Sequence, residues 1–389
     1  MNYDFDRVIP RRHTESIKWG WCDKEELPMW VADMDFRSPE PVIQALHQRV
    51  EHGVFGYGQA GSRLREVIVA WLQQRHGWQV SAEALVFLPG VVPGFNLAAQ
   101  ALTRPGDGLL IQTPVYPPIL HAAENAGLVS QSMELTRLAD GNYEIDFDRF
   151  TATIDKRTRM FLLCNPHNPV GRVFRQSELE RMAEICLQED LIICSDEIHG
   201  DLIFSDHEHR PIAALDPEVA ARTITLMAPS KTFNIAGLGC AFAIITDDGL
   251  RDRFKAGRRG LMGHPNILGY TAAQAAYEEG EPWLVALLEY LEANRDFTYD
   301  FVRQHMPGVR MAKPEGTYLA WLDCREAHLP EGSYDFFRKE AGVMLNKGAT
   351  FGPGGEGFVR LNFGCPRVLL KEGLERMRAA LKGQNFDVA

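Results

Sequence analysis

The stretch MFLLCNPHNP, residues 160–169, decides the fold class, because a short apolar run ends there in a turn that two prolines stiffen. An apolar run of this length, closed by turn residues, is typical of a buried strand. The pattern returns at LIICSDEIH, residues 191–199, and at TITLMAPSKTFN, residues 223–234. In both, polar side chains come directly after the apolar run.

Helical patterns separate these predicted strands. A helix is expected from Ser177, where Glu180 three residues later completes a capping box. Its apolar stripe consists of Leu179, Met182, Ala183 and Cys186. Working outward, we predict strands at 84–88, 108–112 and 240–245 and a helix at 92–102. Alternating strands and helices predict an open, mostly parallel α/β sheet.

The C-terminal part of the sequence has a different pattern. A long helix is expected to start at Pro282 and run to about Gln304, since proline suits the first helical position. Strands at 317–323 and 358–362, separated by helices, predict a smaller α+β domain. We therefore expect a large domain at residues 46–285 and a small domain made of residues 1–45 and 286–389.

Composition and charge exclude several classes of protein. The 389 residues are 45% hydrophobic and carry a net charge of −11, so nucleic acid and anionic membrane surfaces are not expected partners. We expect no secretory signal and no membrane-spanning segment. The seven cysteines include no CxxC pair and lack metal-ligand spacing, which predicts reduced core cysteines in a cytoplasmic protein and no metal site.

Ligands of open α/β sheets bind beyond the carboxyl ends of the strands, so the residues that follow each strand are the candidates. Pro89-Gly90-Val91-Val92 opens a helix whose free N–H groups could hold phosphate, although a plain glycine turn has the same pattern. Tyr116, fixed between prolines, could stack on a flat ring or simply cover the core.

Three further candidates follow three successive strands. Asn168 lies in a rigid polar turn, Asp196 ends a buried strand, and Lys231 stands among small polar residues. A buried carboxylate requires a cationic partner, although Asp196 could instead cap the next helix. A lysine in a pocket can have a lowered pKa and form a Schiff base, although Lys231 could instead be a surface lysine. Together they form the polar complement of pyridoxal phosphate (PLP).

The sequence at this point resembles the class I/II aminotransferase family of PLP fold type I, and most of all the bacterial cystathionine β-lyase-like C–S lyases. The resemblance covers nearly the whole chain. It rests on the segments WVADMDF at 30–36, FGY at 55–57, PGVV at 89–92, TPVY at 113–116, NPHNP at 165–169, SDEIH at 195–199, SKTFN at 230–234 and VRLN at 359–362. It implies a large domain with a mostly parallel mixed sheet between helices, plus a smaller α+β domain.

The resemblance also implies a role for each matching residue. Lys231 forms the Schiff base with PLP and later removes the Cα proton of the substrate. The other cofactor contacts are the amides of Val91 and Val92 and the hydroxyl of Ser230 at the phosphate, Tyr116 and Asn168 at the ring, Asp196 at the ring nitrogen, and Tyr57 from a second subunit. Arg360 binds the substrate carboxylate, and Asp33, Tyr116 and Asn168 border the substrate. His199 either contacts the ring oxygen or is a satisfied structural histidine.

Two positions depart from the aminotransferase pattern. Gly239 stands where many aminotransferases have a phosphate-binding arginine, and Ala228 stands where they often have serine. The resemblance therefore implies a homodimeric, PLP-dependent C–S β-lyase that converts S-substituted cysteines such as L-cystathionine to pyruvate, ammonia and a thiol. An amino-acid aminotransferase is the first alternative, and a PLP-binding regulatory protein is the second.

Overall fold

The structure is a computed structural model that describes residues 3–383. Its largest sheet has seven strands in the order β2-β10-β9-β8-β7-β3-β4. The bounds of these strands are β2 Leu85–Leu88, β3 Gly108–Thr113, β4 Val129–Glu134, β7 Thr158–Cys164, β8 Ile192–Asp196, β9 Thr223–Met227 and β10 Ala241–Ile244. Only β10 runs antiparallel to its neighbours, so the predicted mostly parallel α/β sheet is confirmed.

Side chains of alternate residues in each strand point to opposite faces of this sheet, and both faces are buried. In β7, Leu162 belongs to the buried cluster that also contains residues of α4 (Val91–Leu102) and α11 (Asp248–Gly257). Its neighbours Phe161 and Leu163 pack on the other face, against α8 (Gln176–Gln188). This sandwich explains why the central strands read as continuous apolar runs in the sequence.

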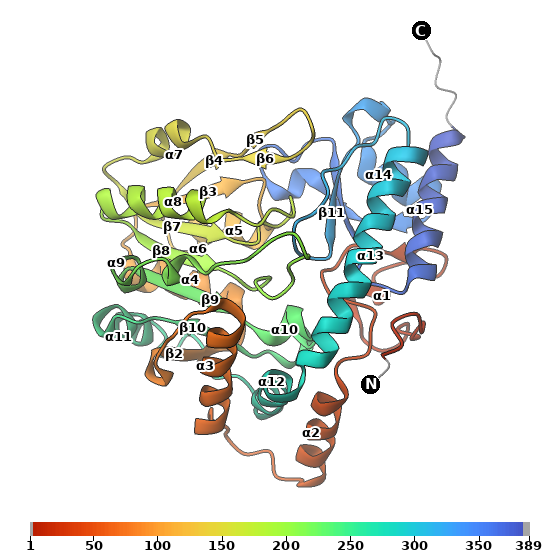
Figure 1. The fold of residues 1–389 in the computed structure, drawn as a ribbon. Coiled ribbons are helices and arrows are strands. Elements are labelled where there is room, and N and C mark those ends of the chain that lie inside the picture. Colours follow the sequence, from red (N-terminus) through yellow and green to blue (C-terminus); the bar gives the residue numbers. More distant parts are fainter. Residues whose placement is uncertain (1–2, 384–389) are drawn as a thin grey trace.

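A second region contains a three-stranded antiparallel sheet, in the order β11-β14-β13. Its elements are β11 Leu319–Asp323, β12 Val343–Met344, β13 Asn346–Lys347, β14 Phe358–Asn362, α14 Ser333–Ala341 and α15 Arg367–Lys382. The N-terminal strand β1 (Leu27–Pro28) pairs with β12, as expected of a segment that packs against this region. Figure 1 shows the long helix α13 (Glu281–His305) between the large sheet and α15. The domain boundaries stay a prediction.

The remaining elements are short connections and covering helices. They are α1 Ile17–Gly20, α2 Glu40–Glu51, α3 Ser62–His76, α5 Pro117–Leu120, α6 Ala122–Asn125, α7 Phe147–Thr153, α9 Pro217–Ala221, α10 Pro229–Thr232, α12 Ile267–Glu279, β5 Thr136–Arg137 and β6 Tyr143–Glu144. The predicted capping box at Ser177 and Glu180 is wrong. The helix begins at Gln176, and Glu178 accepts the Arg175 N–H at 2.9 Å, because Glu178 is the residue three positions after the true cap.

All seven cysteines are free and buried, which confirms their assignment to the core. Between residues 3 and 383, no helix has both the length and the apolar character needed to cross a membrane. The same part of the chain holds no cluster of three or more His, Cys, Asp or Glu side chains that could bind a metal ion.

Candidate active site

A cavity of about 370 Å³ lies at the carboxyl ends of β7, β8 and β9, which are neighbours in the large sheet. Asn168 follows β7, Asp196 ends β8, and Lys231 follows β9, so the sheet order brings these three residues together. The residues that line the cavity include Val91, Val92, Tyr116, Asn168, Asp196, His199, Ser230, Lys231 and Arg360. These residues, which lie up to 269 positions apart in the sequence, thus surround one cavity.

Asp196 is a buried carboxylate that has no positively charged hydrogen-bond partner among the described residues. Its side chain is 4% exposed, and one hydrogen bond reaches it, from the Ile198 N–H at 3.2 Å. Burial raises the pKa of Asp196 to about 7. A carboxylate held in this way is suited to a cationic N–H group supplied by a ligand.

Lys231 lies in α10, which follows β9, and its side chain lines the cavity. Its Nζ donates a hydrogen bond to the Ala32 carbonyl at 2.6 Å. Burial, followed by the positive charge of Arg360, lowers the pKa of Lys231 to about 8. An appreciable fraction of the amine is therefore neutral and nucleophilic near neutral pH.

Arg360 comes from β14 and is a buried cation, 3% exposed. Its guanidinium donates to Asn168 Oδ1 at 2.9 Å, Asn346 Oδ1 at 2.6 Å and the Trp30 carbonyl at 3.1 Å. None of these acceptors is charged, and Nε has no partner in the described part of the chain. Burial lowers the pKa of Arg360 to about 10. A buried guanidinium without an acidic partner indicates an anionic ligand.

The far end of the cavity is formed by the N-terminus of α4. Val91 is the first residue of this helix, so the free N–H groups of its first turn are available to an anion. Gly239 also lines the cavity, with a left-handed φ of +58°, and a Cβ there would lie 3.3 Å from the Pro89 carbonyl. The backbone therefore disfavours any side chain at position 239, where the aminotransferase pattern predicts arginine.

His199 and Tyr116 also line the cavity. The Nδ1 atom of His199 is buried and finds no hydrogen-bond partner within residues 3–383. Burial holds the pKa of His199 well below its usual value, so the ring is neutral. Tyr116 donates its backbone N–H to the Asn168 carbonyl at 3.0 Å, which couples the two loops. The unpartnered nitrogen favours a ligand contact for His199 over a satisfied structural role.

Two predicted site residues lie away from this cavity. Asp33 lines a neighbouring pocket of about 670 Å³ that shares Val31, Ala32, Lys231 and Ala236 with the cavity. Its carboxylate pairs with Arg11 at 2.8 Å. Tyr57 lies in the extended segment between α2 and α3 and is fully exposed. Neither is placed against the cavity by this single chain.

Sequence reasoning missed several residues that shape the site. Asn234 and Asn362 stand in the SKTFN and VRLN segments, but no role was assigned to them. Asn234 accepts the Met34 N–H at 2.9 Å, and Asn362 donates to the Val31 carbonyl at 2.6 Å. Tyr318, the residue before β11, donates a hydrogen bond from its hydroxyl to the Ala32 carbonyl at 2.8 Å. The motif positions of the two asparagines were the only available signal.

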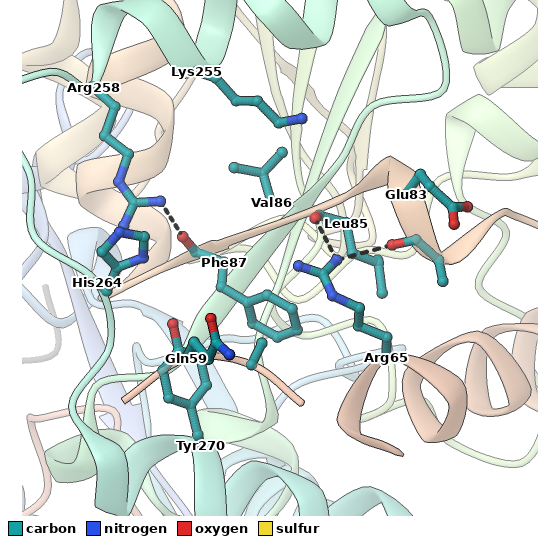
Figure 2. Close-up of a pocket in the computed structure, with 12 residues that line it drawn as sticks. Gln59, Arg65, Glu83, Leu85, Val86, Phe87, Lys255, Arg258, His264 and Tyr270 are labelled. Carbon is teal, nitrogen blue, oxygen red and sulfur yellow. Dashed lines mark hydrogen bonds between the residues drawn. The ribbon is translucent and has the colours of Figure 1, made fainter. Parts of the chain in front are cut away.

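A third pocket, of about 580 Å³, lies along the outer edge of the sheet and contains none of the predicted site residues (Figure 2). Arg65 donates to the Leu85 carbonyl at 3.0 Å, and Arg258 donates to the Phe87 carbonyl at 2.9 Å. These guanidinium groups satisfy backbone acceptors of β2, the edge strand. The pocket thus protects an exposed strand edge rather than gathering reactive groups.

The donor and acceptor set of the cavity fits PLP. Within residues 3–383, Asp196 is a buried acid with no cationic hydrogen-bond partner, His199 Nδ1 has no hydrogen-bond partner, and Arg360 is a buried cation whose acceptors are all uncharged. The first two match the ring nitrogen and ring oxygen of PLP, and the third matches an amino-acid carboxylate. The α4 N-terminus matches a phosphate group, and the Lys231 amine matches the aldehyde.

Comparisons with known proteins agree with this chemistry. The family model "Aminotransferase class I and II" matches residues 27–377. Cystathionine beta-lyase PatB of Bacillus subtilis is 42% identical over 97% of this chain and 100% of that protein. Cystalysin of Treponema denticola, solved with its pyridoxal 5'-phosphate cofactor, superposes with a TM-score of 0.94 at 36% identity over 98% and 100% of the two chains. The PLP-bound C–S lyase of Staphylococcus hominis gives a TM-score of 0.93 at 36% identity over 99% and 100%.

Proposed function

The chain belongs to the class I and II aminotransferase family, and from this membership we propose that it is a PLP-dependent carbon–sulfur β-lyase. It acts on S-substituted cysteines such as L-cystathionine and releases pyruvate, ammonia and a thiol. The observation that carries the proposal is the cavity that holds the Lys231 amine, the Asp196 carboxylate, to which no described cation donates a hydrogen bond, and the Arg360 guanidinium, whose described acceptors are all uncharged. Similarity to cystathionine β-lyases along the whole chain supports the choice of reaction.

PLP, when bound, supplies an aldehyde that condenses with amines and a ring that withdraws electrons from the Cα atom of the attached amino acid. Lys231 would tether the aldehyde. Asp196 would accept a hydrogen bond from the ring nitrogen, and Asn168 and His199 would be the partners of the ring oxygen. Tyr116 would cover the ring, while the α4 amides at Val91 and Val92 and the Ser230 hydroxyl would hold the phosphate.

Lys231 has the second task of removing the Cα proton. Once the substrate amine has displaced it, the lysine is free, and its pKa of about 8 leaves part of it neutral at physiological pH. A base with a pKa near the working pH is close to optimal for proton transfer. The electron pair left at Cα then expels the thiolate from Cβ, and water completes the release of pyruvate and ammonia.

Arg360 orients the substrate. Two parallel N–H groups of its guanidinium suit the two oxygens of the α-carboxylate, and Asn168 and Asn346 fix the plane of the guanidinium. The segment of residues 30–36 borders the substrate, with Asp33 at the pocket that adjoins Lys231. This arrangement leaves the Cβ substituent free to vary, which agrees with a class of thioether substrates.

We also propose that the protein is a homodimer whose sites lie near the subunit interface. An exposed apolar group supports this arrangement, because such surfaces mark interaction sites: Val54, Phe55, Tyr57 and Leu261. Tyr57 of one subunit then reaches the phosphate held by the other. The free, buried state of all seven cysteines supports a cytoplasmic location.

The test is pyruvate formation from L-cystathionine and S-methyl-L-cysteine by the purified, PLP-loaded protein without any 2-oxo acid. We expect pyruvate and thiol in equal amounts. Lys231→Ala should abolish turnover, because loss of a general base alone costs about 10²–10⁴-fold. Product that forms only after addition of a 2-oxo acid would identify an aminotransferase. Absence of any turnover with bound PLP would favour a regulatory protein.

A further inference from the structure

Two hydrogen-bond donors meet at one backbone oxygen beside the proposed reaction centre. The Ala32 carbonyl accepts hydrogen bonds from the Lys231 Nζ at 2.6 Å and from the Tyr318 hydroxyl at 2.8 Å. A carbonyl oxygen has two lone pairs, so both are used. Tyr318 is 1% exposed and lies outside the set of residues assigned to cofactor or substrate. Its contact with the acceptor of the lysine therefore needs an explanation.

The Ala32 carbonyl belongs to a segment whose backbone is fixed on both sides. We call residues 30–36 the strap. Side chains from several other segments donate hydrogen bonds to its carbonyls: Arg360 to Trp30, Asn362 to Val31 and Asp33, Lys18 to Asp33, Asn234 to Met34 and Phe36, and Arg11 to Met34. Only at Ala32 is a reactive group one of the donors. The strap thus holds a single acceptor in front of Lys231, and Tyr318 is the second donor to it.

The backbone before Tyr318 is in an unfavourable conformation. Thr317 has a φ of +68° and is fully buried, although β-branched residues rarely adopt the left-handed region. Its N–H donates to the Leu202 carbonyl at 2.8 Å, which helps to hold that conformation. The ring of Tyr318 packs edge-on against His199 at 6.1 Å. Strain of this kind persists where the placement of a neighbouring group matters.

We propose that Tyr318 is a positioning residue whose hydroxyl fixes the Ala32 carbonyl as the docking point of the Lys231 amine whenever that amine is not bonded to the cofactor. The proposal rests on the proposed function. When the neutral amine takes the Cα proton, it becomes an ammonium group, and the C–H electron pair stays on the substrate. The Ala32 carbonyl then accepts one N–H of that ammonium and keeps it beside Cα.

This docking opposes the effect of burial on the lysine. A carbonyl oxygen at hydrogen-bond distance stabilises an ammonium group more than a neutral amine. Without the Tyr318 hydroxyl, the carbonyl can tilt away, and the ammonium form loses part of its stabilisation. The pKa of Lys231 in the cofactor-free protein is therefore expected to fall when Tyr318 is replaced by phenylalanine.

The experiment compares Tyr318→Phe with Tyr143→Phe in the cofactor-free full chain. Tyr143 is a matched control, since it is buried and its hydroxyl accepts the Trp321 indole N–H at 3.1 Å, far from the cavity. Cyanate, a small reagent that modifies neutral amines, is applied across pH 6–10, and modification of the Lys231 peptide is followed by mass spectrometry. At pH 7 we expect Lys231 to be modified about threefold faster in Tyr318→Phe than in the wild type, which corresponds to one weakened hydrogen bond. The rate in Tyr143→Phe should equal that of the wild type.

Kinetics of the PLP-loaded variants give the second measurement. Tyr318→Phe should lower kcat about fivefold with little change in KM, as expected for one hydrogen bond that acts only after the lysine is freed. The isotope effect with Cα-deuterated substrate should increase, because proton removal becomes more rate-limiting. Tyr143→Phe should match the wild type in both respects.

Modification profiles that coincide for Tyr318→Phe, Tyr143→Phe and wild type would overturn the docking proposal, even if the enzyme is active. A wild type that forms no pyruvate would refute the proposed function, while the cyanate profile still decides the docking. If Tyr318→Phe fails to fold, Thr317→Gly carries the test, since it keeps the hydroxyl and frees the backbone that orients it. That variant should shift the profile in the same direction by a smaller amount, and an unchanged profile would contradict the proposal.

Discussion

Replacement of Asp196 by asparagine should destroy activity and yet stabilise the cofactor-free protein. The carboxyl group is buried, with the Ile198 N–H as its hydrogen-bond donor, and its pKa is raised from 3.8 to about 7. Between those pH values the folded state keeps a proton that the unfolded state has lost, so rising pH favours unfolding. Each pH unit is worth about 1.36 kcal/mol, which gives a penalty of about 4 kcal/mol at most above pH 7.

Asparagine removes this penalty, because it has no charge to bury and its Oδ1 can still accept the Ile198 N–H. Thermal unfolding of the cofactor-free proteins, at one protein concentration, should give equal Tm values near pH 4 and a higher Tm for Asp196→Asn at pH 8. Addition of PLP should reverse the order, since the wild-type carboxylate then gains a cationic partner. A variant that is less stable than wild type by the same amount at both pH values would refute this reasoning.

The remaining predictions concern the substrate anchor, the general base and the phosphate end. Arg360→Lys should lower kcat/KM about 10²-fold, since one bidentate contact with the substrate carboxylate is lost, while the absorbance of bound PLP stays the same. S-conjugates of cysteamine lack the carboxylate, so they should react equally with both proteins. The rate of Cα deuterium exchange should rise with pH to a plateau above about 8, because burial lowers the pKa of Lys231 to about 8 and the base must be neutral. A flat profile from pH 6 to 9 would exclude Lys231 as the base. Gly239→Arg should lower the Tm, with a cost of about 1–2 kcal/mol, because position 239 has a φ of +58° and lies against the Pro89 carbonyl, whereas Gly237→Ala, with free space around it, should behave as wild type.

The positions of the reactive residues could be predicted because sheet topology is simple to infer. Asn168, Asp196 and Lys231 each follow an apolar run, and parallel strands place their carboxyl ends at one edge. The strand at 358–362 was predicted with the right bounds, which placed Arg360 on a strand of the second region. Long apolar runs with clear ends leave few alternatives.

Other features of the site have no signal in a single sequence. The acceptor for Lys231 is a backbone carbonyl, and every residue has one, so nothing in the sequence distinguishes Ala32. Lys18 is fully buried against Asp35 at 2.6 Å, although lysine is usually exposed. The capping box was predicted two residues too late, because Ser177 is a common N-cap residue and Arg175 is not. The contacts of Lys231 and Lys18 join distant segments, whereas the capping box depends on a local choice between two neighbouring caps.

The central claim is that Lys231 tethers the cofactor. Borohydride reduction of the PLP-loaded protein converts a carbon–nitrogen double bond between lysine and cofactor to a stable single bond, and peptide mass spectrometry then locates it. We predict the pyridoxyl phosphate mass on the peptide that contains Lys231. The same mass on a peptide with another lysine, or on none, would contradict the account.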